Sequence, residues 1–438
     1  MKKQATACLP LLLVVLAADI LLAQSYYKGT TLQSLGAGSP ANGNTVALGI
    51  NDSGIIVGTS ALLSGGRHAT TWSTDGTVRD LGTLGGNSGV GFAINNLGQV
   101  VGASSLPDNS RSEPFLWTQS GGMQDLGGLG SGTDNAALAI NHNTAIVGRS
   151  CLDSLNHSCH AFLWTQAGGM QDLGTLGGSF SEGTGINAAG HVTGWSTHPD
   201  GTRHGFLWTA QTGMQELLPN ETFESFPWAI SDSDQVAGAF NDPQDNQSHA
   251  FSWTPSTGLQ DLGTLGSGFS EALATNDSGD VVGFARTADN TGYSVIWKKA
   301  GAPQKLALLV SPNNPMLLGE AATGINAAGQ ISANGKKKLY LLNPRTQTAL
   351  TSSPNPSTHG QAVTFTAVVT SYLGVPPDGE TVSFMRGTTV LGSGSLNHGA
   401  ASFTTSTLKV GTTYIKAVYG GDASFLGSKS NTVQQVVN

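Results

Sequence analysis

Histidine recurs at one position of a long repeated motif, four residues before a tryptophan. The four copies are His68, His160, His204 and His249, with Glu113 and Tyr293 at the same position in two other repeats. Histidines at regular spacing are potential zinc ligands, but zinc holds its ligands at about 2 Å. Equivalent positions in neighbouring repeats lie too far apart for this unless they line a common axis. We therefore expect a structural role, a hydrogen bond inside each repeat between the histidine and the polar edge of the tryptophan.

Two cysteines in one polar segment offer a second kind of chemistry. Cys151 and Cys159 stand in "SCLDSLNHSCHAF", with His157 and His160 beside them. The spacing matches no common zinc pattern, whereas two cysteines in one loop of an exported protein usually form a disulfide. The sequence therefore predicts a disulfide between Cys151 and Cys159 and no metal site.

Acidic residues give no catalytic set. Asp277 and Asp280 could suggest calcium, but the alternating ligand run of a calcium loop is missing, so a turn is the better interpretation. A glycan hydrolase would need two converging carboxylates, and most acids of this chain recur at repeated turn positions. We predict no catalytic residues, no cofactor and no enzymatic activity.

One segment departs from its repeat and is the best candidate for a binding site. Residues 217–234 read "LLPNETFESFPWAISDSD", where other copies have "LGTLGG". They add Phe223, Phe226 and Trp228 beside two glutamates, and Trp195 is a further tryptophan outside the repeat register. Aromatic faces beside acids are suited to binding sugars, although the same rings could instead pack between repeats. We take Phe223, Phe226, Trp228 and Trp195 as candidate ligand-binding residues.

The repeat itself has a period of about 45 residues. Tryptophan recurs at positions 72, 117, 164, 208, 253 and 297. The pattern "IN-x-x-G-x-V-V-G" recurs seven times, beginning at residues 50, 94, 140, 186, 230, 275 and 325. Its asparagine and glycine are typical of a tight turn, and the last glycine of most copies indicates close backbone approach.

Each repeat contains about four short runs of alternating apolar and polar residues, separated by turn residues. Such runs predict strands, and four strands per repeat are typical of a propeller blade. The sequence therefore predicts an all-β fold with a closed, seven-bladed β-propeller over roughly residues 30–343. A β-solenoid of the same repeats is the alternative.

The repeats also resemble a known bacterial family. "HAFLWTQAGGMQDLGTLGG" at 160–178 and "HAFSWTPSTGLQDLGTLG" at 249–266 resemble the extracellular HAF repeats, which are named for this tripeptide. The resemblance covers roughly residues 30–343. It implies an exported, propeller-like repeat protein and no agreed activity.

The last part of the chain has a different pattern. Residues 346–438 contain about seven short alternating runs, which predict an immunoglobulin-like β-sandwich. The stretch from Tyr419 to Phe425, "YGGDASF", resembles the end of bacterial Ig-like domains. In that family such domains serve as spacers and adhesive modules.

The first residues and the composition bear on location and partners. Lys2 and Lys3 precede an apolar run and Ala23, a pattern that predicts a signal peptide over residues 1–23; a retained membrane anchor is the alternative. No later segment is apolar enough to span a membrane. A net charge of −8 with 11% charged residues provides no basic surface for nucleic acid, so we expect no nucleic-acid partner.

The sequence favours a non-catalytic, secreted or cell-surface binding and adhesion protein, with an extracellular glycan or a cell-surface protein as partner. A secreted glycan-active hydrolase or lyase on a propeller is the alternative, and a purely structural matrix component is a third.

Overall fold

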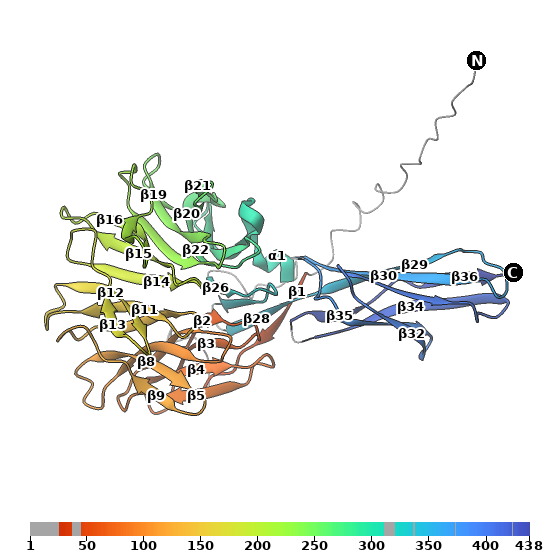
Figure 1. Ribbon diagram of the computed structural model, residues 1–438, viewed down its shortest axis with the longest axis horizontal. Coiled ribbons are helices and arrows are strands. Elements are labelled where there is room, and N and C mark those ends of the chain that lie inside the picture. The colour runs from red at the N-terminus through yellow and green to blue at the C-terminus, as the bar shows by residue number, and fades with distance from the viewer. Residues whose placement is uncertain (1–25, 37–44, 311–319, 336–337, 373, 423) are drawn as a thin grey trace, which may run out of the picture.

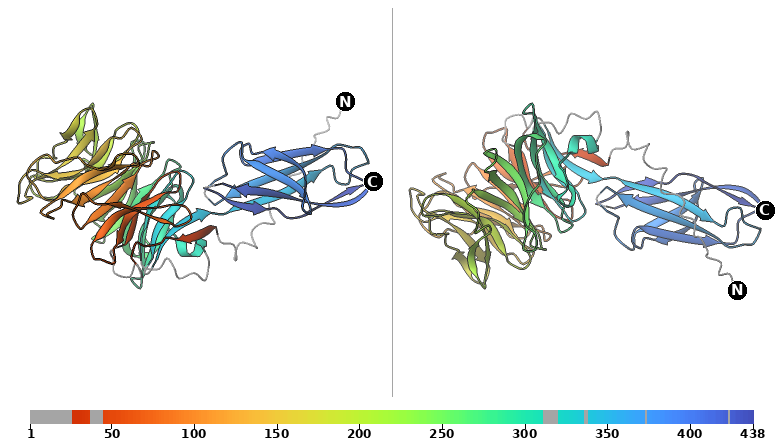
Figure 2. Two further views of the ribbon diagram at one scale, coloured as in Figure 1. Left: turned by 90° about the horizontal axis from the view of Figure 1, so that it is seen from below. Right: turned by 90° about the horizontal axis from the view of Figure 1, so that it is seen from above.

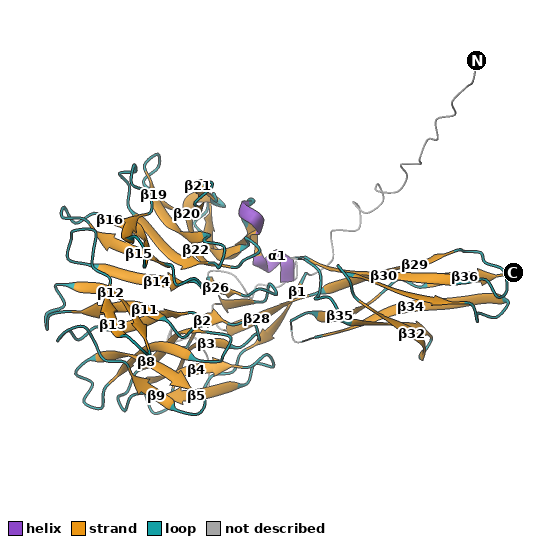
Figure 3. Ribbon diagram, in the orientation of Figure 1, coloured by secondary structure: helices purple, strands orange, loops and turns teal. Residues whose placement is uncertain are grey.

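The computed structural model describes residues 26–36, 45–310, 320–335, 338–372, 374–422 and 424–438. The signal peptide predicted over residues 1–23 lies outside them. The described chain is all-β, with a β-propeller followed by an immunoglobulin-like sandwich (Figures 1 and 3). The predicted fold class is confirmed.

The propeller consists of seven four-stranded antiparallel sheets within the described residues. Blade 1 contains β2 (Val46–Ile50), β3 (Ile56–Ala61), β4 (Arg67–Trp72) and β5 (Val78–Gly82). Blade 2 contains β6 (Gly89–Ile94), β7 (Val100–Ser105), β8 (Ser112–Thr118) and β9 (Gly122–Asp125). Blade 3 contains β10 (Ala136–Ile140), β11 (Ile146–Cys151), β12 (Cys159–Thr165) and β13 (Gly169–Asp172).

The remaining blades follow the same plan. Blade 4 contains β14 (Ser181–Ile186), β15 (Val192–Thr197), β16 (Arg203–Thr209) and β17 (Gly213–Glu216). Blade 5 contains β18 (Ser225–Ile230), β19 (Val236–Asp242), β20 (Gln247–Thr254) and β21 (Gly258–Asp261). Blade 6 contains β22 (Gly266–Thr275), β23 (Val281–Thr287), β24 (Gly292–Trp297) and β25 (Gln304–Lys305). Blade 7 contains β26 (Ala322–Ile325), β27 (Ile331–Gly335), β28 (Lys338–Pro344) and β1 (Tyr27–Thr31).

Blade 7 closes the ring because it joins the two ends of the repeat region. Its first three strands come from the last repeat, and its fourth strand, β1, pairs antiparallel with β28 in the register Tyr27 opposite Pro344. A 3-10 turn, η2 (Lys298–Ala300), and the short helix α1 (Leu306–Val310) lie before this blade. Separating the ends would therefore break a sheet as well as an interface between blades.

Blades pack against one another through apolar faces, since a single small sheet cannot bury both of its sides. The phenylalanines of the third strands are fully buried, among them Phe162 in blade 3 and Phe206 in blade 4. One core cluster joins Val147 and Ala161 of blade 3 to Phe206 and Trp208 of blade 4. The apolar alternation in each repeat thus supplies the interfaces between blades.

The turn between the first two strands of each blade links that blade to the next. In blade 3, the Asn141 Oδ1 atom accepts the backbone N–H groups of Asn143 and Ala145, at 3.0 and 2.9 Å. Its Nδ2 atom donates to the backbone carbonyl of Asn187 in blade 4, at 2.9 Å. The same cross-blade bond is made by six asparagines, with distances from 2.9 to 3.2 Å: Asn51, Asn95, Asn141, Asn187, Asn276 and Asn326.

These turns surround the propeller axis. A cavity of about 200 Å³ is lined by turn residues of all seven blades. The link from Asn326 to the Asn51 carbonyl joins the last repeat to the first. In blade 5 the equivalent residue is Ser231, whose hydroxyl bonds only within its own turn, to Ser233 and Gln235.

The repeated glycine of the second strand is required by a bulge in the first strand. In every blade the first strand contains one extra residue, a bulge, three positions before the asparagine or serine that begins the turn. A Cβ atom at Gly58 would lie 1.9 Å from the Val46 carbonyl oxygen, and one at Gly148 would lie 1.9 Å from that of Ala136. The close approach expected from the sequence is confirmed.

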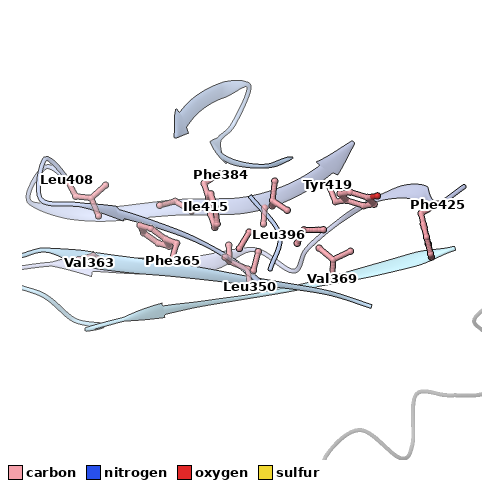
Figure 4. Close-up of a cluster of buried hydrophobic side chains, with 14 of the residues drawn as sticks. Leu350, Val363, Phe365, Val369, Phe384, Leu396, Leu408, Ile415, Tyr419 and Phe425 are labelled. Atoms are coloured by element: carbon pink, nitrogen blue, oxygen red, sulfur yellow. The ribbon is translucent and has the colours of Figure 1, made fainter. Parts of the chain in front are cut away.

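The C-terminal sandwich has its own core. One sheet contains β29 (Thr346–Ser353), β30 (Val363–Ser371) and β33 (Ala400–Thr405). The other contains β31 (Thr381–Arg386), β32 (Thr389–Ser395), β34 (Gly411–Gly421), β35 (Leu426–Lys429) and β36 (Val433–Val437). Between them lie fully buried side chains that include Phe365 and Phe384 (Figure 4). The sandwich extends away from the propeller, as Figure 2 shows.

The asparagine links lead to a prediction. Asn141→Ala removes two partly buried bonds inside its turn and one buried bond between blades, so we expect a loss of about 2–3 kcal/mol in the free energy of unfolding. Ser231→Ala is the matched control, because it occupies the same position without a cross-blade bond, and we expect a loss of about 1 kcal/mol or less. Urea unfolding of both variants measures this, and equal losses would contradict a role for the cross-blade bond.

Candidate functional site

The repeated histidines pair with carboxylates. His68, His160, His204 and His249 place Nδ1 within 2.6–3.0 Å of a carboxylate oxygen on the fourth strand of the same blade. The partners are Asp80, Asp172, Glu216 and Asp261, in that order. The prediction of a hydrogen bond between histidine and tryptophan is therefore wrong, since each histidine pairs with a carboxylate. The antiparallel register explains the pairing, because Asp172 stands opposite Phe162, which makes it the diagonal neighbour of His160.

In the two blades where Glu113 or Tyr293 replaces the histidine, the replacing residue contacts a basic side chain. In blade 2, Glu113 is buried and forms an ion pair with Arg111 at 2.6 Å. Burial raises the pKa of Glu113 above its ordinary value, and this effect outweighs the lowering by Arg111. In blade 6, the Lys305 ammonium lies 4.0 Å from the centre of the Tyr293 ring. The position thus serves contacts within a blade and is part of the scaffold.

A second repeated contact holds the segment that leads into a blade against the second strand of that same blade. In four blades a serine of the second strand accepts the N–H group of a leucine in that segment, at 2.8 or 2.9 Å. The pairs are Ser60 with Leu35, Ser104 with Leu84, Ser150 with Leu129, and Ser196 with Leu176. The hydroxyl holds the segment against the strand.

Blade 5 has Phe240 at this serine position. Its ring lies 5.1 Å from the ring of Phe223, which belongs to the irregular segment before β18. Phe240 offers no hydroxyl, and Asn220, which replaces the leucine, has no hydrogen bond through its N–H group within the described chain. A cavity of about 510 Å³ lies beside this segment, lined in part by Phe223, Phe240 and Trp253.

Polar groups line the other part of this cavity, which we call the blade 5 cavity. They are Asn220, Glu221, Asp242, Gln244 and Asp261. Three aspartates also meet His249, whose Nδ1 atom lies 3.0 Å from Asp261 and 3.5 Å from Asp242, while Nε2 lies 3.2 Å from Asp245. An apolar wall therefore faces a rim of carboxylate and amide groups, an arrangement that suits a ligand with an apolar face and several hydroxyl or cationic groups.

The four candidate ligand-binding residues do not converge. Phe223 lines the blade 5 cavity. Trp195 of β15 contacts Phe226 of β18, with ring centres 6.2 Å apart, and it stacks on Phe180 at 4.9 Å. Arg203 covers the other side of this group, 5.4 Å from the Trp195 ring. All four aromatic residues considered from the sequence are partly buried.

Trp228 lies apart from both groups. It is the extra residue of the bulge in β18, between Pro227 and Ala229. Its indole N–H group is buried and has no hydrogen-bond partner among the described residues. Nothing in its surroundings connects it with Phe223.

Sequence reasoning missed Phe240, Trp253 and His249 as members of a site. Trp253 and His249 are regular members of the repeat and carry no signal of their own. Phe240 does carry one, because the aligned positions in the first four repeats are serines. A comparison of the second strands, column by column, could have found it.

The cysteine prediction is confirmed. Cys151 and Cys159 form a disulfide and stand opposite each other at the ends of β11 and β12. The bond closes the polar loop of blade 3. It lies in a different blade from the blade 5 cavity.

Comparisons with known proteins characterise the C-terminal region. Residues 350–438 match the family model of the bacterial Ig-like domain (group 3). No curated protein sequence matches the chain. Within the described residues, no helix is long and apolar enough to cross a membrane.

Solved structures with a similar arrangement share little sequence with this chain. The extracellular domain of a putative hybrid two-component system from B. thetaiotaomicron is 10% identical, with a TM-score of 0.46, and the match covers 93% of this chain. The chain spans only 59% of the length of that domain. A gluconolactonase from Xanthomonas campestris is 11% identical over 75% of this chain and 92% of its own, with a TM-score of 0.36.

His249 gives a pH-dependent prediction. Burial lowers the pKa of this imidazole, but the bonds and charges of Asp261 and Asp245 raise it more, so the net shift is above the ordinary value of 6.5. A raised pKa in the folded state stabilises the fold below about pH 6.5, and this contribution is lost as the pH rises through the folded value.

We therefore expect His249→Gln to cost more stability at about pH 5.5 than at about pH 8. Urea unfolding at both values measures the difference. His359→Gln serves as the control, because His359 is exposed and makes no side-chain contact among the described residues. A cost of His249→Gln that stays constant or grows with pH would contradict the assignment.

Proposed function

We propose that this chain is an exported HAF-repeat protein that binds an extracellular glycan in the blade 5 cavity without catalysing a reaction. The observation that carries the proposal is the cavity itself, which lies where blade 5 departs from the serine contact of four other blades. A ring of near-equal blades offers near-equal surfaces. A distinct binding site therefore requires a blade that departs from the pattern.

Two observations support an extracellular or cell-surface location. The C-terminal region matches a bacterial Ig-like domain. Cys151 and Cys159 form a disulfide, and such bonds persist in oxidising compartments outside the cytoplasm. The Ig-like module would then hold the propeller away from its point of attachment, or would bind a cell-surface protein itself.

The chemistry of the blade 5 cavity fits a sugar. The rings of Phe223, Phe240 and Trp253 supply apolar surface for the C–H face of a pyranose. Glu221 and Asn220 are exposed at the rim, where a carboxylate and an amide can bond to hydroxyl groups. The Glu221 carboxylate has no bond to another described residue, so it is available to a ligand.

The carboxylates support binding more than hydrolysis. Asp242 and Asp261 both contact the same nitrogen of His249, at 3.5 and 3.0 Å. Hydrolysis of a glycosidic bond uses one carboxyl group as an acid and a second as a base or nucleophile. Two aspartates that share one imidazole are occupied as structural partners. A hydrolase or lyase stays the alternative, because Glu221 provides a third carboxylate in the same cavity.

A glycan array with the purified mature protein tests the proposal. We expect binding to a restricted set of glycans, a loss of about tenfold or more in affinity for Phe223→Ala, and a smaller loss for Glu221→Gln. Phe226→Ala is the matched control, because this aromatic residue of the same repeat lies in the Trp195 group. We expect it to retain full affinity.

Several outcomes would overturn the proposal. Binding lost in Trp195→Ala and retained in Phe223→Ala would move the site to the Trp195 group. Release of shortened glycans from a bound oligosaccharide, detected by mass spectrometry, would establish the enzymatic alternative. A melting temperature of Phe223→Ala many degrees below that of the native protein would show that Phe223 serves packing.

A further inference from the structure

Blade 4 differs from the other blades in the surroundings of its repeated histidine. Here the pair of His204 and Glu216 is joined by a second imidazole, that of His198, from the turn between β15 and β16. Ligand atoms of the three side chains lie within 4.8 Å of one another. His204 is buried, whereas His198 and Glu216 are partly exposed. A solute can therefore reach the group from one side.

The distance between His198 and Glu216 does not fit a hydrogen bond. The Nε2 atom of His198 lies 3.7 Å from the Oε2 atom of Glu216, beyond the range of such a bond. Two atoms that bind one zinc ion at about 2.0–2.1 Å lie about 3.3–3.6 Å apart at tetrahedral to trigonal angles. The observed gap is close to what a bridging metal ion requires.

The scaffold holds the three ligands in place from three elements. His204 lies on β16 and Glu216 ends β17, and their side chains are joined at 2.6 Å. His198 begins a tight turn in which its N–H group donates to the Thr202 carbonyl at 2.9 Å, and the Asp200 carboxylate caps Thr202. Little of the backbone would have to become ordered on metal binding.

The two imidazole rings stack in parallel, with centres 4.3 Å apart and planes at 12°. For both lone pairs to reach one ion, the His198 ring has to tilt toward the ion. It is able to do so because it makes no hydrogen bond through its ring to any described residue. The metal would replace the proton between His204 and Glu216, so that pair must widen by about 0.7 Å.

Other blades show what the pair does without a third ligand. In blade 3, His160 and Asp172 form the same pair at 2.8 Å, and the loop places the Ser158 hydroxyl 3.5 Å from the Nε2 atom of His160. The pair alone is thus part of the scaffold. The additional imidazole of blade 4 stacks on that of His204 and has no counterpart in blade 3.

We propose that His198, His204 and Glu216 bind a divalent transition metal ion such as Zn²⁺. The repeat pattern predicts no metal here, because His198 lies outside the repeat register. Two imidazoles and a carboxylate form a known zinc donor set that leaves a coordination position open. A carboxylate or hydroxyl group of a ligand or a partner could occupy that position. The proposal goes beyond glycan binding and does not depend on it.

Isothermal titration with ZnCl₂ tests the site, using the mature protein without an affinity tag after dialysis against a chelator. We expect one zinc ion per chain, with an affinity at least about tenfold lower in His198→Ala. The melting temperature of His198→Ala without metal should match that of the native protein, while added Zn²⁺ should raise only the native value. Co²⁺ in place of zinc should give visible absorption bands that disappear in the same variant.

His160→Ala is the matched control, because it removes the equivalent histidine of blade 3. We expect its zinc affinity to be unchanged. The proposal fails if the native protein binds no Zn²⁺ at 100-fold excess, or if His198→Ala retains the full affinity. It also fails if Asp245→Ala abolishes zinc binding while His198→Ala does not, since the ion would then lie with the aspartates around His249 in blade 5.

Discussion

The propeller depends on one repeated side chain, the asparagine of the turn after the first strand in six of its seven blades. Its carbonyl oxygen satisfies two N–H groups of its own turn, and its amide donates to the turn of the next blade. A single residue type therefore fixes a turn and the spacing between blades together. The bond from Asn326 to Asn51 joins the last repeat to the first, next to the sheet that β1 completes.

A scaffold fixed in this way can tolerate exchanges at other columns of the repeat. The serine of the second strand is replaced by Phe240 in blade 5, and the cavity of this blade lies beside Phe240 and Phe223. The turn before the third strand can acquire His198 without disturbing the pair of His204 and Glu216. Both exchanges lie in neighbouring blades, on either side of the segment that begins at Leu217. Both candidate sites of this protein thus lie where two adjacent repeats depart from their common pattern.

The Ig-like sandwich is stabilised separately, since its buried side chains come almost entirely from its own strands. It meets the propeller through Tyr372, whose ring lies 4.9 Å from Tyr26 and 4.8 Å from the Lys298 ammonium. Strand β1 is close to this junction, because the N–H group of Arg345 donates to the Tyr26 carbonyl at 2.8 Å. Strand β1 therefore completes blade 7 and also lies beside the start of the sandwich.

The sequence by itself determined the elements and their number. Period-two alternation, the recurring tryptophan and the Asn-x-x-Gly turn are local patterns. Strands and turns form from residues that are close along the chain, so local patterns predict them. It also determined the Cys151–Cys159 bond, because the two residues are close along the chain. The tertiary structure decided the partners of polar side chains. The sequence paired His160 with tryptophan, but the strand register turned it toward Asp172.

The candidate sites show the same division. The sequence shows directly that the fifth repeat is irregular, and Phe223 of that repeat lines a cavity. The sequence could not predict the contact of Phe226 with Trp195 or that of His198 with Glu216. Each contact joins residues from different strands or blades. Their distances depend on how the sheets twist and pack around the ring. That packing is a property of the closed propeller, which no single repeat contains.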